Sequence, residues 1–184
     1  MHHIFLIGYR CTGKTSVGRR LALARQLPCY DTDVLIGEQA GKTIKEWVEE
    51  KGWESFRQIE KAVIRKISSW PPGVIALGGG AVLDAENRVI IKENGLVVWL
   101  KADVQTILKR MRSDSLTEGQ RPPLSAEDQE TEIRETLAAR TPLYQALADI
   151  QIDTQGKTIE DIIEEIGGIE GFEGSRIQMK SGEV

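Results

Sequence analysis

Gly8-Tyr9-Arg10-Cys11-Thr12-Gly13-Lys14-Thr15 is the stretch that decides the fold of this chain. Two glycines separated by four residues and followed by Lys and Thr fit the phosphate-binding loop pattern. An apolar run at residues 3–7 precedes the stretch and a helical pattern follows it, which is the context the pattern requires. In such a loop, backbone N–H groups and the start of a helix converge on an anion. We therefore predict a nucleotide phosphate site at the end of a strand. An ordinary glycine turn is the alternative.

Particular side chains of this loop suit a nucleoside triphosphate. Lys14 would bring a positive charge to the β- and γ-phosphates, and the Thr15 hydroxyl would ligate Mg²⁺. ATP and Mg²⁺ are thus the expected cofactors. The other residues expected to contact the nucleotide at this loop are Gly8, Cys11, Thr12, Gly13 and Ser16.

The composition is that of a globular protein of about one domain. The chain has 184 residues, of which 40% are hydrophobic and 28% are charged, and its net charge of −4 gives no sign of binding to nucleic acid or to a membrane surface. Two cysteines are too few for a disulfide framework. No apolar run approaches the length of a membrane span, and no signal pattern opens the chain. We expect a cytoplasmic monomer that acts on a small molecule.

Strands alternate with helices along the chain, which predicts an α/β fold with a parallel sheet covered on both faces. Strands are expected at residues 3–7, 29–30, 73–77, 95–100 and 148–152. Helices are expected at residues 15–26, 34–41, 43–51, 53–69, 104–112, 127–139 and 158–166, with Thr141-Pro142 opening a further turn. We predict one domain over residues 1–166, a mobile lid at about residues 113–125 and a flexible tail at residues 167–184.

Asp31 and Asp33 follow the second expected strand directly. In open parallel sheets, ligands bind at the carboxyl ends of the strands. Beside a phosphate loop, one carboxylate can hold the metal through water while the other takes a proton from an attacking hydroxyl. A turn that caps the following helix is the alternative, and it explains one aspartate better than two.

Two arginines are candidates for anion binding. Arg57 lies one helical turn before Glu60, which can fix its guanidinium for a carboxylate or phosphate ligand. A solvated surface pair is the alternative. Arg140 lies on a helical stripe with Ile133 and Tyr144, where a charge needs a buried partner or a ligand unless it extends into solvent.

Gly78-Gly79-Gly80 follows the third expected strand. Three adjacent glycines weaken a structure unless their space or dihedral angles are needed, so we predict close approach by a substrate. Arg121, in the expected lid, could swing onto the transferring phosphoryl group. Arg110 and Arg112 precede the lid and could flank the nucleotide base, with a solvated helix face as the alternative.

Together these features resemble the shikimate kinase family, over about residues 4–166. The resemblance rests on the phosphate loop, Asp31-Thr32-Asp33, Phe56-Arg57 with Glu60, the glycine triplet, Arg121-Pro122 with Leu124, and Arg140 four residues before Tyr144. It implies a three-layer P-loop fold with a five-stranded parallel sheet of order 2-3-1-4-5. It also implies a substrate-binding helical region around residues 34–60.

By resemblance, the chain would transfer the γ-phosphate of ATP to the 3-hydroxyl of shikimate. Asp33 would contact the shikimate hydroxyls and act as the base, while Asp31 and Thr15 would serve Mg²⁺. Lys14 and Arg121 would stabilise the phosphoryl group in transfer. The remaining implied contacts are Arg57, Gly79, Gly80 and Arg140 for shikimate and Arg112 for adenine.

The chain departs from the family pattern at three places. Cys11 stands where a third glycine is usual in the phosphate loop, the lid reads Arg-Pro-Pro-Leu where Arg-Pro-Leu is usual, and the stretch from Arg112 to Arg121 is slightly long. Two other functions stay open: a gluconate kinase-like enzyme, and a non-catalytic module that binds a nucleotide or shikimate. The glycine triplet and Phe56-Arg57 argue against the first. Lys14, Asp33 and Arg121 argue against the second.

Overall fold

The structure, a computed structural model, describes residues 2–113 and 126–168, with the backbone alone at residues 126–128. The lid predicted at residues 113–125 lies outside the described residues except for Ser113, as does the predicted tail beyond residue 168. Within the described ranges, no helix has the length and apolar character needed to cross a membrane.

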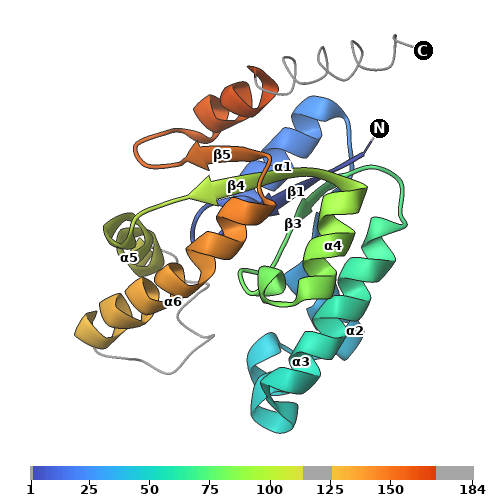
Figure 1. Ribbon diagram of the computed structural model, residues 1–184, viewed down its shortest axis with the longest axis vertical. Coiled ribbons are helices and arrows are strands. Elements are labelled where there is room, and N and C mark those ends of the chain that lie inside the picture. Colours follow the sequence, from blue (N-terminus) through green and yellow to red (C-terminus); the bar gives the residue numbers. More distant parts are fainter. Residues whose placement is uncertain (1, 114–125, 169–184) are drawn as a thin grey trace.

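Strands and helices alternate as the sequence predicts (Figure 1). In chain order the elements are β1 (His3–Ile7), α1 (Lys14–Arg25), β2 (Cys29–Asp31), α2 (Thr32–Ala40), α3 (Ile44–Ser68), β3 (Val74–Ala76), η1 (Ala81–Leu83), α4 (Ala85–Asn94), β4 (Gly95–Lys101), α5 (Val104–Ser113), α6 (Ala126–Leu147) and β5 (Ile150–Asp153). A last helix covers residues 159–168. The five strands are parallel and lie in the order β2-β3-β1-β4-β5, which confirms the order that the resemblance implied.

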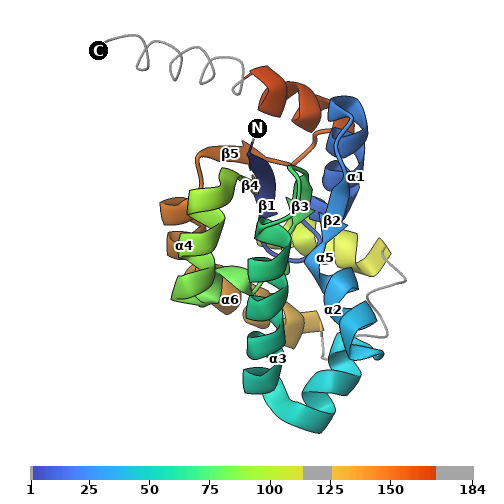
Figure 2. The same cartoon turned by 90° about the vertical axis from the view of Figure 1, so that its right-hand side faces the viewer.

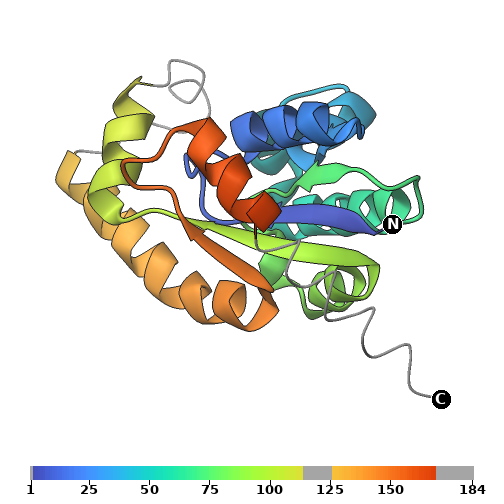
Figure 3. The ribbon, with the colours of Figure 1, turned by 90° about the horizontal axis from the view of Figure 1, so that it is seen from above.

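Helices cover both faces of the sheet (Figure 3). Ile4 and Leu6 of β1 pack with α1 and the last helix on one face. Phe5 and Ile7 pack with α3, α4 and α6 on the other. All five residues of β1 are buried, as a central strand between two helical layers requires.

The region between β2 and β3 is helical, as predicted, with a sharp bend (Figure 2). The helices expected over residues 43–51 and 53–69 are the two parts of α3, and they meet at Gly52. Its φ of 77° and ψ of 168° are not helical, and they suit glycine because no Cβ opposes them. The bend separates the first part of α3 from the long second part that packs on the sheet.

The prediction at Pro142 was wrong. Thr141-Pro142 does not open a separate turn, because α6 continues from Ala126 to Leu147 with Pro142 inside it. Proline removes one helical hydrogen bond and tends to end or bend a helix. Here buried side chains on both sides of the proline, Ile133 before it and Tyr144 after it, pack into the core and hold the helix together.

One helix was not predicted. Residues 81–94 carry η1 and α4, and Asp84 caps α4 by accepting hydrogen bonds from the N–H groups of Glu86 and Asn87. An Asp before a helix followed by an acidic first turn is the available signal. The helix is short and buries only Asn87 and Ile91, so its apolar periodicity is weak.

Candidate active site

Three of the predicted motifs meet at one edge of the sheet. The Gly8–Thr15 loop follows β1, Asp31 ends β2, and the glycine triplet follows β3. Since β2, β3 and β1 are parallel neighbours, their carboxyl ends lie side by side. This edge is where open parallel sheets bind ligands.

The phosphate loop has the backbone that its glycines predict. Gly8 and Gly13 have φ values of 141° and 94°. A Cβ at Gly8 would lie 2.4 Å from the carbonyl oxygen of Leu100, so a side chain there would collide with β4. Gly13 caps α1, and Ser16 in its first turn is exposed.

Lys14 bends back over the loop. Its Nζ donates to the Tyr9 carbonyl at 2.7 Å, and the Thr12 hydroxyl donates to the same oxygen at 2.8 Å. Burial lowers the pKa of Lys14, while the negative charges of Asp33 and Asp31 oppose that shift. A lysine among carboxylates in a crowded loop is suited to exchange the carbonyl for a phosphate oxygen.

Cys11 occupies the left-handed region with a φ of 59°, a conformation that favours glycine. Its carbonyl accepts from Arg110 Nη1 at 3.2 Å. Arg110 also donates to the hydroxyl of Thr154 at 2.9 Å and to its carbonyl at 2.8 Å. Arg110 therefore ties the phosphate loop to the end of β5, whereas Arg112, the residue implied for adenine, is exposed at the end of α5.

The two oxygens of Asp31 have different partners. Its Oδ1 accepts from the N–H groups of Asp33 at 3.0 Å and Val34 at 3.4 Å, so the helix-cap alternative is correct for this aspartate. Its Oδ2 accepts from the Thr15 hydroxyl at 2.7 Å. Capping thus leaves the second oxygen of Asp31 beside the phosphate loop.

Asp33 turns toward the glycine triplet instead of capping the helix. A Cβ at Gly78 would lie 2.6 Å from Asp33 Oδ1. Solvent reaches the side chain of Asp33, but the surrounding protein still desolvates its carboxyl group. This desolvation and the negative charge of Asp31 both raise the pKa of Asp33. Lys14 and Arg57 act in the opposite direction. The carboxylate lies beside the glycine triplet, and its environment favours proton uptake.

Arg57 is fixed by a buried partner. Its Nη1 donates to Glu60 Oε2 at 2.6 Å, and Glu60 is only 1% exposed, so the surface-pair alternative is wrong. Burial raises the pKa of Glu60, and the Arg57 guanidinium opposes that shift. A Cβ at Gly80 would lie 2.4 Å from Arg57 Nη2. The guanidinium therefore occupies the space that Gly80 leaves open.

Arg140 reaches the same turn from α6. Its Nη1 donates to the Gly79 carbonyl at 2.9 Å, and the Tyr144 hydroxyl donates to the same oxygen at 2.6 Å. Arg57 and Arg140 thus arrive at adjacent glycines from different helices. Thr32, which is fully buried, completes the turn by accepting from the N–H of Gly78 at 2.9 Å.

Three residues to which the sequence assigned no role form hydrogen bonds with groups that are distant in the chain. Tyr144 bonds a carbonyl 65 residues away, and Thr32 bonds an N–H 46 residues away. Thr154 meets Arg110 across 44 residues. Tyr144 was noted only for its spacing from Arg140, and an aromatic residue with a hydroxyl on the buried stripe is the one signal available for it.

The donor set fits a magnesium ion that is held together with nucleotide phosphates. Within residues 2–113 and 126–168, no group of three or more His, Cys, Asp or Glu side chains could hold a metal alone. The adjacent oxygens of Thr15 and Asp31 match the one or two protein ligands that Mg²⁺ takes beside phosphates and water. Arg121, predicted to act on the phosphoryl group, lies outside the described residues.

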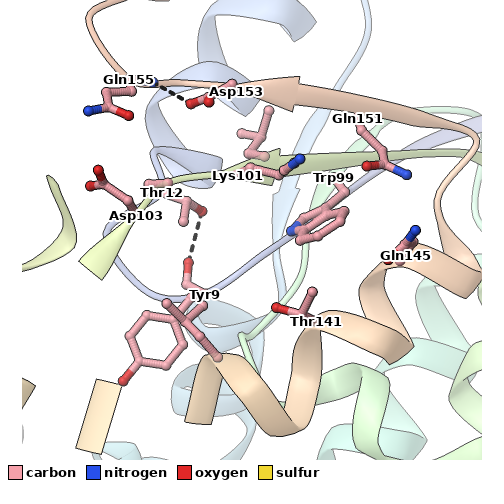
Figure 4. A pocket seen from close by; sticks show the side chains of 13 residues that line it. Tyr9, Thr12, Trp99, Lys101, Asp103, Thr141, Gln145, Gln151, Asp153 and Gln155 are labelled. Carbon is pink, nitrogen blue, oxygen red and sulfur yellow. Dashed lines mark hydrogen bonds between the residues drawn. The ribbon is translucent and has the colours of Figure 1, made fainter. Parts of the chain in front are cut away.

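A cavity of about 360 Å³ lies beside this cluster, between the ends of β4 and β5 and the helix α6 (Figure 4). It shares Tyr9 and Thr12 with the phosphate loop, and polar side chains such as Lys101, Gln151 and Asp153 line it. None of Asp33, Arg57 and the glycine triplet lines it. The chemistry assembled above is therefore at the open edge of the sheet and not in this cavity.

Comparison with known proteins gives a consistent result. A family model described as shikimate kinase matches residues 10–168. The shikimate kinase of Syntrophus aciditrophicus (strain SB) is 41% identical over 172 residues, covering 89% of this chain and 88% of that protein. A solved structure of the shikimate kinase from Acinetobacter baumannii in complex with shikimate has a TM-score of 0.84 and 34% identity, and covers 92% of each chain. A gluconokinase from Sinorhizobium meliloti 1021, at 17% identity and a TM-score of 0.61, covers 96% of this chain and 97% of that one and shares the fold alone.

Proposed function

The chain belongs to the shikimate kinase family, and from this premise we propose how its residues carry the phosphoryl group from ATP to shikimate. It is an ATP-dependent kinase that acts on a hydroxyl of shikimate. We assign the transfer to the 3-hydroxyl, giving shikimate 3-phosphate and ADP. The observation that supports this mechanism is the meeting of one carboxylate, Asp33, and two arginines around a glycine turn beside the phosphate loop.

ATP binds at the loop from Gly8 to Thr15, with the backbone N–H groups toward the phosphates. Lys14 exchanges the Tyr9 carbonyl for oxygens of the β- and γ-phosphates. Thr15 and Asp31 would hold Mg²⁺, which when bound would neutralise charge on those phosphates. Arg112 contacts adenine. Its exposed side chain supports this assignment, because Arg110 is engaged with Cys11 and Thr154.

Shikimate binds across the glycine triplet. Arg57 and Arg140 bind its carboxylate, since a guanidinium fork matches the geometry of a carboxylate. Gly79 and Gly80 contact the ring of the substrate through their backbone, and Gly80 also leaves room for the Arg57 guanidinium. Residues 34–60, which follow Asp33 directly and contain Arg57, form the substrate side of one domain over residues 1–166.

The chemical step is an in-line displacement. The oxygen of the 3-hydroxyl attacks the γ-phosphorus, the bond to the oxygen bridging the β- and γ-phosphates breaks, and the hydroxyl proton passes to the Asp33 carboxylate. Lys14 stabilises the charge on the transferring group. The resemblance to the family assigns the same role to Arg121.

A coupled assay of ADP release with a panel of hydroxy acids tests this function. We expect turnover with shikimate and none with gluconate. Turnover with gluconate and none with shikimate would favour the gluconate kinase alternative. ADP binding with no turnover of any acceptor would favour the binding module.

We also propose that the protein is cytoplasmic and acts as a monomer. The phosphate loop, Asp33, Arg57 and Arg140 meet at one edge of a single sheet, so the proposed site needs no second copy of the chain. Light scattering after size-exclusion chromatography measures the mass directly. A single species at 20.5 kDa is expected, and a stable species at twice that mass would contradict the monomer.

A further inference from the structure

Tyr144 is a buried tyrosine whose hydroxyl faces the glycine triplet. The side chain is 1% exposed, and its ring stacks on Trp99 with centroids 5.6 Å apart. The hydroxyl donates to the Gly79 carbonyl at 2.6 Å. Burial raises the pKa of Tyr144 to about 12, so the hydroxyl keeps its proton, and remains a donor, at any pH at which the enzyme works.

The Gly79 carbonyl has two donors, which is the number that its two lone pairs can accept. The second is Arg140 Nη1 at 2.9 Å. Tyr144 and Arg140 lie four residues apart on the same helix, α6, and so approach this oxygen from one side. The side chain of Tyr144 is held by packing, whereas the long, flexible side chain of Arg140 is partly exposed.

The neighbouring glycines are held by other means. Thr32 binds the N–H of Gly78, and the Arg57 guanidinium fills the space beside Gly80. Within residues 2–113 and 126–168, the side-chain hydrogen bonds to Gly79 are those that its carbonyl accepts from α6. The middle of the turn therefore depends on Tyr144 and Arg140.

We propose that Tyr144 is a positioning residue: its hydroxyl holds the Gly79 carbonyl so that Arg140 can leave that carbonyl and bind the carboxylate of the substrate. The proposal rests on the function assigned to Arg140 above. If the hydroxyl were absent, departure of Arg140 would leave the carbonyl without a donor, which opposes the move. Tyr144 thus keeps the turn in place and makes Arg140 available to the substrate.

Isothermal titration of shikimate into four proteins tests this coupling: the wild type, Tyr144→Phe, Arg140→Ala and the double variant. Tyr144→Phe keeps the ring and its stacking, so we expect a folded protein with unchanged ADP affinity. Shikimate affinity should fall by about tenfold, the effect of leaving one polar group without its partner. In the Arg140→Ala background, the same change should alter shikimate affinity by less than about twofold, because no arginine remains to be released.

Tyr30→Phe is the matched control, since the ring of Tyr30 packs against Gly73 and Trp70, away from the glycine triplet, and its variant should bind shikimate like the wild type. Unchanged shikimate affinity in Tyr144→Phe would overturn the proposal, and so would an equal loss in both backgrounds. Wild-type affinity in Arg140→Ala would instead remove Arg140 from the substrate site. That outcome contradicts the proposed function of Arg140, and the role of Tyr144 falls with it.

Discussion

Asp31 and Asp33 lie two positions apart in the sequence but have different surroundings and different proposed roles. Asp31 ends β2, caps α2 and bonds Thr15, while Asp33 lies against Gly78 among charges of both signs. The backbone of α2 fixes the first carboxylate and leaves the second available to a substrate. The role of Asp33 as base can therefore be tested by removing its charge alone.

Asp33→Asn should retain ADP binding and lose turnover by about 10²-fold or more, as expected when a general base is removed. Steady-state rates with saturating shikimate and ATP, together with ADP titration, provide the measurement. Glu160→Gln, an exposed carboxylate on the last helix, is the control and should retain wild-type rates. An Asp33→Asn variant with wild-type turnover would remove Asp33 from the mechanism.

The pH dependence of kcat/KM should report the same group. Burial and Asp31 raise the pKa of Asp33 above its ordinary value of 3.8, and a base must be deprotonated to act. Activity is therefore expected to fall as the pH drops through that raised pKa, with an acid limb above pH 3.8. A kcat/KM for shikimate that shows no acid limb above pH 3.8 would contradict the assignment.

Cys11 has a backbone conformation that suits the glycine usual at its position. At a φ of 59°, an L side chain raises the free energy of the folded state by about 1–2 kcal/mol. Glycine avoids this cost, but its greater conformational freedom in the unfolded chain offsets part of the gain. Cys11→Gly should thus exceed Cys11→Ala in free energy of unfolding by about 0.5–1 kcal/mol. Both variants remove the thiol and its contacts, so chemical denaturation compares the backbone effect directly. Equal stability, or a more stable alanine variant, would show that the loop can relax.

At the scale of elements, the glycine turn after β3 links the two arginine-bearing helices. Arg57 comes from α3 and occupies the space beside Gly80, whereas Arg140 comes from α6 and binds the Gly79 carbonyl. Two adjacent residues of one turn therefore contact both guanidinium groups.

Gly80→Ala tests the space that this turn provides. The new Cβ would lie 2.4 Å from Arg57 Nη2, and the flexible end of Arg57 can move aside, so the protein should fold with a displaced guanidinium. The KM for shikimate is expected to rise by about tenfold or more, because small misplacements of binding groups are costly. The KM for ATP should be unchanged. In the control Gly37→Ala the Cβ meets nothing closer than 3.7 Å, and both constants should stay as in the wild type. An equal rise in both KM values for Gly80→Ala would indicate general disruption of the fold.

Elements differ in how far the sequence predicts them. β1, β3 and β4 are apolar runs buried on both faces, and their pattern leaves little choice. The bend at Gly52 was predicted because glycine ended one helical pattern before the next began. The continuity of α6 through Pro142 was not, since it depends on core packing on both sides of the proline and not on local preference.

At the scale of the whole molecule, the parallel sheet brings distant motifs to one edge. The phosphate loop, the aspartates and the glycine triplet could each be found from residue type and spacing. Their supporting contacts could not, because Thr32, Tyr144 and Thr154 bond backbone groups that only the tertiary fold brings near. The motif residues can be recognised from residue type and spacing, whereas the residues that hold them in place can be recognised only from the tertiary structure.

The central claim is that the sheet edge transfers the γ-phosphate of ATP to the 3-hydroxyl of shikimate. Phosphorus NMR of the reaction mixture, with assignment of the carbon that bears the new phosphate, measures this directly. We predict a single phosphate monoester at the 3-position, formed in step with ADP. Phosphate on another hydroxyl, or release of inorganic phosphate with shikimate unchanged, would contradict it.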